Sequence, residues 1–206
     1  KRGSAVFSLT APTLTFESFS TVRLEASQVT ADGDLQAGTT TVDIESVRPG
    51  TSLTVNANGG NDVVNLSPTA NNLDTIRGPV TVNGTSAWRE DVNLNDQSFH
   101  TAIPGALERY TVDSDTVTRY FDPSPTIPTN KFPGLEFNDV GEVTLRTGPF
   151  SDVITVEETL AGTEVTVDAG PASTDFVVVG DGRFDLIRDR VTVLGSGLDV
   201  VSVSAA

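Results

Sequence analysis

The chain of 206 residues contains no cysteine, no methionine and one histidine. The absence of cysteine excludes disulfide scaffolds, thiol catalysis, iron–sulfur clusters and cysteine-based zinc sites. The single histidine, His100, excludes a metal site built from several histidines of one chain. Because an initiator methionine is missing as well, we expect these residues to be a processed or excised piece of a longer protein.

Basic residues are also scarce: 13 Lys and Arg stand against 28 Asp and Glu, for a net charge of -15. Nucleic-acid binding requires a basic footprint, so the acidic excess argues against DNA and RNA as partners. No apolar run approaches the roughly 18 residues of a membrane-spanning helix, so we expect no membrane span. The charge is typical of a well-solvated surface that can gather divalent cations.

What the chain does contain favours β-structure. Val and Thr are abundant, and both are β-branched residues that favour strands. Gly and Pro, with 18 and 11 copies, supply turns together with Asn and Asp. Apolar and polar residues alternate with period two, as in Val80-Thr-Val82 and Val165-Thr-Val167. The sequence therefore predicts an all-β protein.

A short motif repeats along the chain. It consists of an alternating strand, a Gly turn and an Asp that opens a second apolar strand. Within each half of the chain its first strand recurs every 22–27 residues, and the copies begin at Leu53, Val80, Val143, Val165 and Val191.

A longer repeat contains these motifs, because residues 50–55 match 162–167 and residues 73–77 match 184–188. We therefore predict a first repeat unit over 1–98, a junction over 99–109 and a second unit over 110–206. Proline-rich residues 121–134 form a loop in the second unit.

Two architectures fit this pattern. A right-handed parallel β-solenoid (β-helix) of about 22–27 residues per coil explains the short repeat, because every coil solves the same packing problem. Two tandem immunoglobulin-like β-sandwiches also have about seven strands in roughly 100 residues. A sandwich has no reason to repeat one strand–turn–strand motif, so we favour the solenoid.

The segments 53–66 and 76–84 resemble bacterial surface and secreted proteins with degenerate Gly-Asn-Asp repeats. Such proteins are adhesin-like, loosely labelled haemolysin-type calcium-binding, and common in planctomycete-like bacteria. The resemblance covers most of the chain. It implies an extracellular or cell-surface location and a structural or adhesive role.

The sequence departs from a calcium β-roll, which repeats Gly-Gly-x-Gly-x-Asp-x-apolar-x every nine residues. Only residues 59–64 approach that pattern, and the copies lie about 25 residues apart. A calcium-dependent β-roll module nevertheless remains an alternative function. Candidate calcium ligands are Asp32, Asp34, Asn61, Asp62, Asp181 and Asp185.

The aspartates that open apolar strands have two interpretations. They could form a calcium ladder, or their carboxylates could accept backbone N–H bonds at the corners of the chain. We favour the second interpretation for all five, which are Asp62, Asp91, Asp152, Asp175 and Asp199.

Other candidate chemistry is weaker. The cluster of Asp and Arg over 181–190 could act on acidic polysaccharides, although alternating charge is typical of a solvated turn. His100 lies in a junction with no nucleophile motif. Trp88 interrupts the repeat and could stack on a sugar ring or anchor a partner. A carbohydrate-binding or carbohydrate-active β-helix is therefore a second alternative, but we expect no catalytic residue and no required cofactor.

Both ends of the chain carry apolar strands, at residues 5–9 and 199–206. Unpaired strand edges of a solenoid add further strands. We expect neighbouring repeats or identical subunits to pair there, giving a fibre or a lattice. The predicted function is a structural or adhesive segment of an extracellular repeat protein, with no enzymatic activity; polysaccharide is a further candidate partner.

Overall fold

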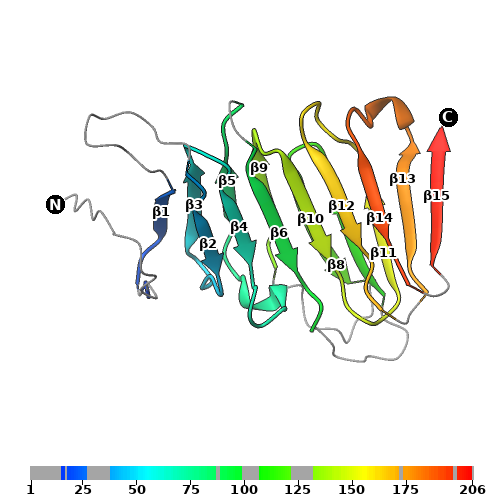
Figure 1. The fold of residues 1–206 in the computed structure, drawn as a ribbon. Helices are drawn as coiled ribbons and strands as arrows, with labels where there is room; N and C mark the ends of the chain where they lie inside the picture. Colours follow the sequence, from blue (N-terminus) through cyan, green and yellow to red (C-terminus); the bar gives the residue numbers. More distant parts are fainter. Residues whose placement is uncertain are drawn as a thin grey trace.

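The computed structural model describes residues 15–16, 18–26, 38–86, 89–98, 107–121, 132–171, 174–196 and 199–205. Within these residues the chain is all-β, with no α-helix and two short 3-10 turns, η1 (Leu73–Thr75) and η2 (Phe184–Leu186). None of the described helical turns is long and apolar enough to cross a membrane. The chain runs from one end of a stack of strands, at β1, to the other, at β15 (Figure 1).

The strands form two sheets that face each other. The six-stranded sheet consists, in spatial order, of β14 (Val191–Leu194), β12 (Glu164–Asp168), β10 (Glu142–Arg146), β6 (Asp91–Asn95), β4 (Val63–Leu66) and β2 (Thr41–Ile44). The nine-stranded sheet consists, in spatial order, of β1 (Thr21–Ala26), β3 (Ser52–Ala57), β5 (Val80–Asn83), β9 (Leu135–Asn138), β8 (Thr116–Phe121), β7 (Glu108–Val112), β11 (Asp152–Val156), β13 (Phe176–Gly182) and β15 (Val200–Ala205).

Pairing between described strands is parallel except where β8 pairs with β7 and β9. This arrangement is consistent with a parallel β-solenoid, in which the chain alternates between the two sheets. Immunoglobulin-like sandwiches are built from antiparallel strands, so the pairing disagrees with the tandem-sandwich alternative.

The short sequence repeat matches the observed register. Leu53 pairs with Val80, and Val165 pairs with both Val143 and Val191. In-register stacking places like residues above one another, so the inward valines and leucines of successive coils form one continuous core between the sheets.

Outward positions of the same strands carry hydrogen-bonded amide ladders. Asn138 donates to Asn83 at 3.0 Å, Asn83 to Asn56 at 2.8 Å, and Asn56 to Glu25 at 3.0 Å. A parallel stack brings each amide within reach of its copy one strand away, so every link satisfies one more polar group.

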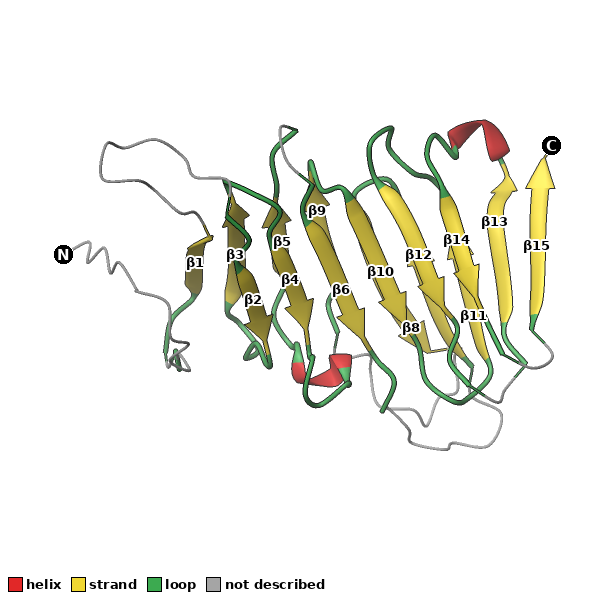
Figure 2. Cartoon of the chain, in the orientation of Figure 1, coloured by secondary structure: helices red, strands yellow, loops and turns green. Residues whose placement is uncertain are grey.

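The longer repeat has an unexpected placement. Residues 73–77 include η1, which connects β4 of the six-stranded sheet to β5 of the nine-stranded sheet. The matching residues 184–188 include η2, which makes the opposite connection, from β13 to β14. The two turns lie at opposite edges of the stack (Figure 2). The matching segments are therefore offset by half a coil, with the roles of the two sheets exchanged.

One insertion interrupts the regular stack. After β6 the chain enters β7, returns through the antiparallel strand β8, and then takes β9, which resumes the stack beside β5. The hairpin widens the nine-stranded sheet by two strands that have no counterpart opposite. Strand β7 begins at Glu108, inside the range 99–109 that was expected to be a junction; residues 122–131 of the proline-rich loop lie outside the described part.

Candidate functional site

Only some of the sequence-predicted metal ligands lie within the described residues. Asp32, Asp34 and Trp88 lie outside the described residues, as does His100. Asp181 and Asp185 are exposed near η2, far along the chain from Asn61 and Asp62. Asn61 is exposed and accepts the backbone N–H of Arg89 through Oδ1 at 3.3 Å. Among the described residues, no group of three or more His, Cys, Asp or Glu side chains is placed to hold a metal ion.

The strand-opening aspartates occupy two rows rather than one ladder. Asp62 precedes a strand of the six-stranded sheet, whereas Asp152, Asp175 and Asp199 occupy the opposite edge, at the starts of strands of the nine-stranded sheet. Asp91 is not the structural equivalent of Asp62. The register pairs Asp91 with Val63, because Asn93 and Leu94 align with Asn65 and Leu66.

The corner interpretation of these aspartates is confirmed for three of them. Oδ1 of Asp62 accepts the N–H of Thr40 at 2.7 Å. Oδ1 of Asp175 accepts the N–H of Asp152 at 2.8 Å, and Oδ1 of Asp199 accepts the N–H of Asp175 at 3.1 Å. Each carboxylate thereby caps the backbone of the preceding coil, which is a structural role.

A buried polar cluster surrounds Arg119, and no motif of the sequence indicates it. On β8, Val117 and Arg119 both point into the core, because side chains two residues apart share a face. The Arg119 side chain is fully buried, which is rare for arginine unless it is paired. The only sequence signal is the alternation of β8 itself, which places an arginine at an inward position.

Carboxylates and aromatic rings enclose the guanidinium. Nη1 donates to Oδ2 of the fully buried Asp96 at 2.5 Å, and Nη2 donates to Asp74. The Phe132 ring centroid lies 6.0 Å from the guanidinium carbon. The phenol oxygen of Tyr110 lies 2.9 Å from both Asp96 Oδ2 and Glu108 Oε2. The cluster thus joins the inserted hairpin to the end of β6 and to η1.

Burial and nearby like charge raise the pKa of Glu108 in this cluster, and of the neighbouring Asp152. Burial, with a contribution from the nearby charge of Asp96, raises the pKa of Glu108 to about 8. Burial also raises the pKa of Asp152 to about 8, with contributions from Asp175 and Asp96. Burial alone would lower the pKa of Arg119, but Asp96 and its other acidic neighbours raise it overall, so the guanidinium stays charged. The cluster can hold protons, and one pocket of the described chain lies elsewhere.

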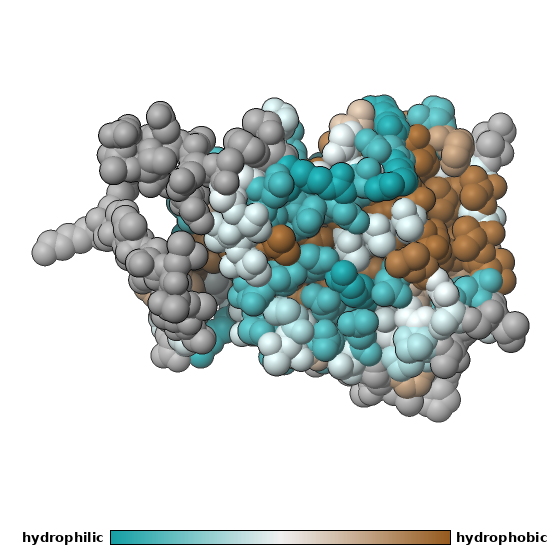
Figure 3. Space-filling view, in the orientation of Figure 1, coloured by the Kyte–Doolittle hydropathy of each residue, from teal (hydrophilic) through white to brown (hydrophobic). Residues whose placement is uncertain are grey.

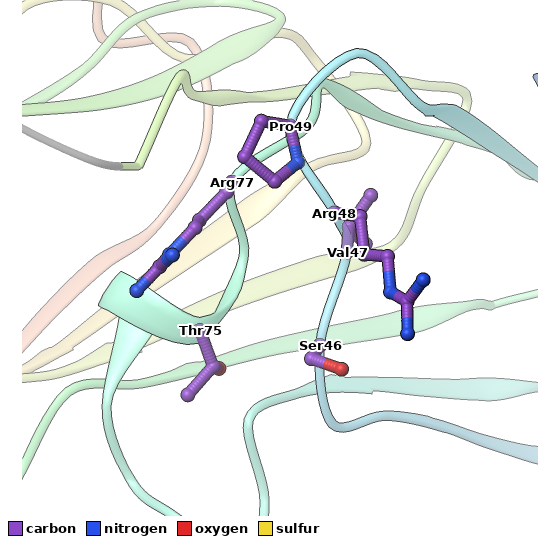
Figure 4. Close-up of a pocket in the computed structure, with 6 residues that line it drawn as sticks. All are labelled: Ser46, Val47, Arg48, Pro49, Thr75 and Arg77. Atoms are coloured by element: carbon purple, nitrogen blue, oxygen red, sulfur yellow. The ribbon is translucent and has the colours of Figure 1, made fainter. Parts of the chain in front are cut away.

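That pocket, of about 250 Å³, lies between the turn before β3 and the turn that carries η1 (Figure 4). The side chains of Arg48 and Arg77 point away from each other in it, and Arg77 Nε donates to the Asp74 carbonyl at 3.2 Å. The pocket is lined by Ser46, Val47, Arg48, Pro49, Thr75 and Arg77. No carboxylate or imidazole is among them, so the lining offers no pair of side chains for acid–base catalysis.

The C-terminal end of the stack is open. Val201 and Val203 of β15 pair with the buried, core-facing Val177 and Val179, yet they are 51% and 62% exposed. The six-stranded sheet ends at β14, so no described strand faces β15. Figure 3 shows hydrophobic residues gathered over this end. Inward valines that would be buried in any interior coil are uncovered here.

The chain has no match among protein-family models, curated proteins or solved structures.

Proposed function

We propose that this chain is a structural segment of an extracellular or cell-surface repeat protein, and that it lengthens by adding strands at its C-terminal end. In this proposal the stack is a right-handed parallel β-solenoid of 22–27 residues per coil. The observation that carries the proposal is the uncovered inward face of β15 beside the free edge of β14.

The missing piece has a defined shape. One further strand, parallel to β14 and hydrogen-bonded to its free edge, would face β15 and cover Val201 and Val203. Because each valine is already about half buried, covering the rest would contribute about 1 kcal/mol per valine, and backbone pairing would fix the register. An interior coil of this chain does the same for the coil before it.

We assign the added strand to a neighbouring repeat of the same protein or to an identical chain. At one end of the stack the edge strands of the two sheets are β1 and β2, and at the other end they are β15 and β14. The two ends therefore present different surfaces. Contact between unlike ends is head-to-tail, and head-to-tail contacts generate open filaments when they do not close into a ring. The resemblance to degenerate Gly-Asn-Asp surface proteins supports the same role.

Sedimentation velocity over a range of chain concentrations tests this proposal. The natural sequence should form oligomers as concentration rises, and V203D should remain monomeric, because a carboxylate on the uncovered inward face cannot be buried. V200D is the matched control, since Val200 lies on the same strand but on the outward face and is 46% exposed. It should associate like the natural chain. A natural chain that stays monomeric, or V200D and V203D behaving alike, would contradict the proposal.

A further inference from the structure

Two buried acids lie side by side at one corner of the six-stranded sheet. Asp62 and Glu90 each precede the first residue of a strand, and the pairing of Val63 with Asp91 makes them neighbours across β4 and β6. The backbone confirms their proximity, because the N–H of Asp91 donates to the Asp62 carbonyl at 2.9 Å. Both residues are 0% exposed.

In each carboxylate one oxygen accepts a hydrogen bond and the other has no partner among the described residues. Oδ1 of Asp62 accepts from Thr40, and Oε1 of Glu90 accepts the hydroxyl of Thr85 at 3.3 Å. Oδ2 of Asp62 and Oε2 of Glu90 are buried and receive no hydrogen bond from the described residues. A buried carboxylate oxygen without a donor is costly, and two of them on neighbouring strands indicate a missing positive group.

A backbone carbonyl faces the same space. A Cβ at Gly84 would lie 2.9 Å from Glu90 Oε2 and 2.3 Å from the carbonyl oxygen of Asp139. The absent side chain of Gly84 therefore leaves the free oxygen of Glu90 and this carbonyl open to one another. Asp139 has a φ of 51°, so its turn conformation sets the direction of that carbonyl.

We propose that Asp62 and Glu90 bind one divalent cation between adjacent coils, with the Asp139 carbonyl and the Thr85 hydroxyl as further oxygen ligands. Carboxylate, carbonyl and hydroxyl oxygens are hard ligands, and a site that supplies them from the protein suits Ca²⁺ better than Mg²⁺, which retains several waters. The two carboxylates come from successive coils, unlike the nine-residue pattern of a β-roll. The cation would join the coils at a corner remote from the open end, so this inference stands independently of self-association.

The alternative physical solution is a proton. Burial raises the pKa of both Asp62 and Glu90, and the charge of Asp62 adds to the rise at Glu90. If one of the two carboxyl groups is protonated, it can donate a hydrogen bond to the free oxygen of the other. Such a pair would bind no metal. The two solutions therefore give opposite results in a metal titration.

Isothermal titration of the chelator-treated chain with CaCl₂ tests the proposal. We expect one Ca²⁺ per chain and a binding constant at least tenfold weaker for Mg²⁺. E90Q should weaken calcium binding by at least tenfold. E157Q, which changes an exposed glutamate outside the corner, should bind calcium like the natural chain.

Thermal melting in EDTA keeps the test independent of folding defects. There E90Q should melt at or above the temperature of the natural chain, because the substitution removes a buried charge, and only the natural chain should gain stability from added CaCl₂. D62N provides a second variant with the same expectation. Absence of a calcium-dependent shift in the natural chain, or an equal shift in E90Q and D62N, would overturn the proposal.

Discussion

At the scale of single residues, the buried acids make stability depend on pH in an unusual direction. The pKa of Asp152 is about 8 in the folded chain, against roughly 3.9 for an unfolded aspartate. Between about pH 4 and pH 8 the folded chain therefore binds more protons than the unfolded chain. The contribution of this carboxyl to the free energy of unfolding falls as pH rises through that window.

The substitution D152N should remove this dependence. Asparagine carries no charge at any pH. As the pH rises from 5 to 8, the free energy of unfolding of D152N should therefore increase by about 1–3 kcal/mol relative to that of the natural chain. Urea unfolding at pH 5, 6, 7 and 8 measures the difference. D115N, at an exposed position in the turn between β7 and β8, is the control and should run parallel to the natural chain. Parallel curves for D152N as well would show that Asp152 is ionised in the folded state.

Residue roles were only partly predictable from sequence. The capping role of Asp62 followed from its place after a Gly turn. The role of Glu90 was not predicted, because the sequence motif aligns Asp91 with Asp62. The observed register instead pairs Asn93 with Asn65, which places Glu90 beside Asp62. Arg119 escaped notice because a charged residue in a strand is normally assigned to the outward face.

At the scale of elements, the corners depend on contact between backbones of successive coils. Gly60 has a φ of +92°, and a Cβ there would stand 1.5 Å from the carbonyl oxygen of Gly38. Gly50 has a similar φ of +80°, but a Cβ there would meet nothing within 4 Å. A substitution at Gly50 therefore tests only the free-energy cost of the left-handed conformation, whereas one at Gly60 adds the cost of a steric clash with the neighbouring coil.

We expect G50A to lower the free energy of unfolding by about 1–2 kcal/mol, the cost of a left-handed conformation for alanine. G60A should lower it by more than about 4 kcal/mol, because the corner must also open. Chemical denaturation of both variants measures the difference. Equal losses would mean that the coils can separate at this corner without cost.

Elements were the most predictable level, because the alternation of Val and Thr and the recurring Gly turns have direct local causes. Copies of the short motif that were matched from sequence, at Leu53 and Val80 or at Val165 and Val191, pair in that register. The β7–β8 hairpin was not predictable. Its strands alternate like all the others, and only pairing partners far along the chain distinguish a hairpin from another coil.

At the scale of the whole molecule, the two halves share one core. Strand β5 pairs with β9 and β6 with β10, so both sheets run across the boundary between residues 1–98 and 110–206. The ion pairs of Arg119 with Asp74 and Asp96 cross the same boundary within the interior. The halves are thus continuous in hydrogen bonding and in packing.

A single cooperative transition should follow from this continuity. Calorimetry of the natural chain should show one peak, and R119M should move the whole peak to lower temperature. Removing one partner of a buried ion pair costs about 3–5 kcal/mol, because the buried Asp96 loses its counter-ion. R23M removes an exposed pair with Glu25 and should change stability by less than about 1 kcal/mol. Two separate peaks in the natural chain would contradict a shared core.

The β7–β8 hairpin also shows how many strands an insertion into such a stack can contain. An inserted pair of strands returns the chain to its original direction, so β9 and β11 on either side still run parallel to their neighbours in the stack. A single inserted strand would reverse that direction and break every later pairing. Length variants should therefore differ by even numbers of strands, and the flanks of the hairpin are where a foreign two-stranded segment can be grafted without disturbing the coils.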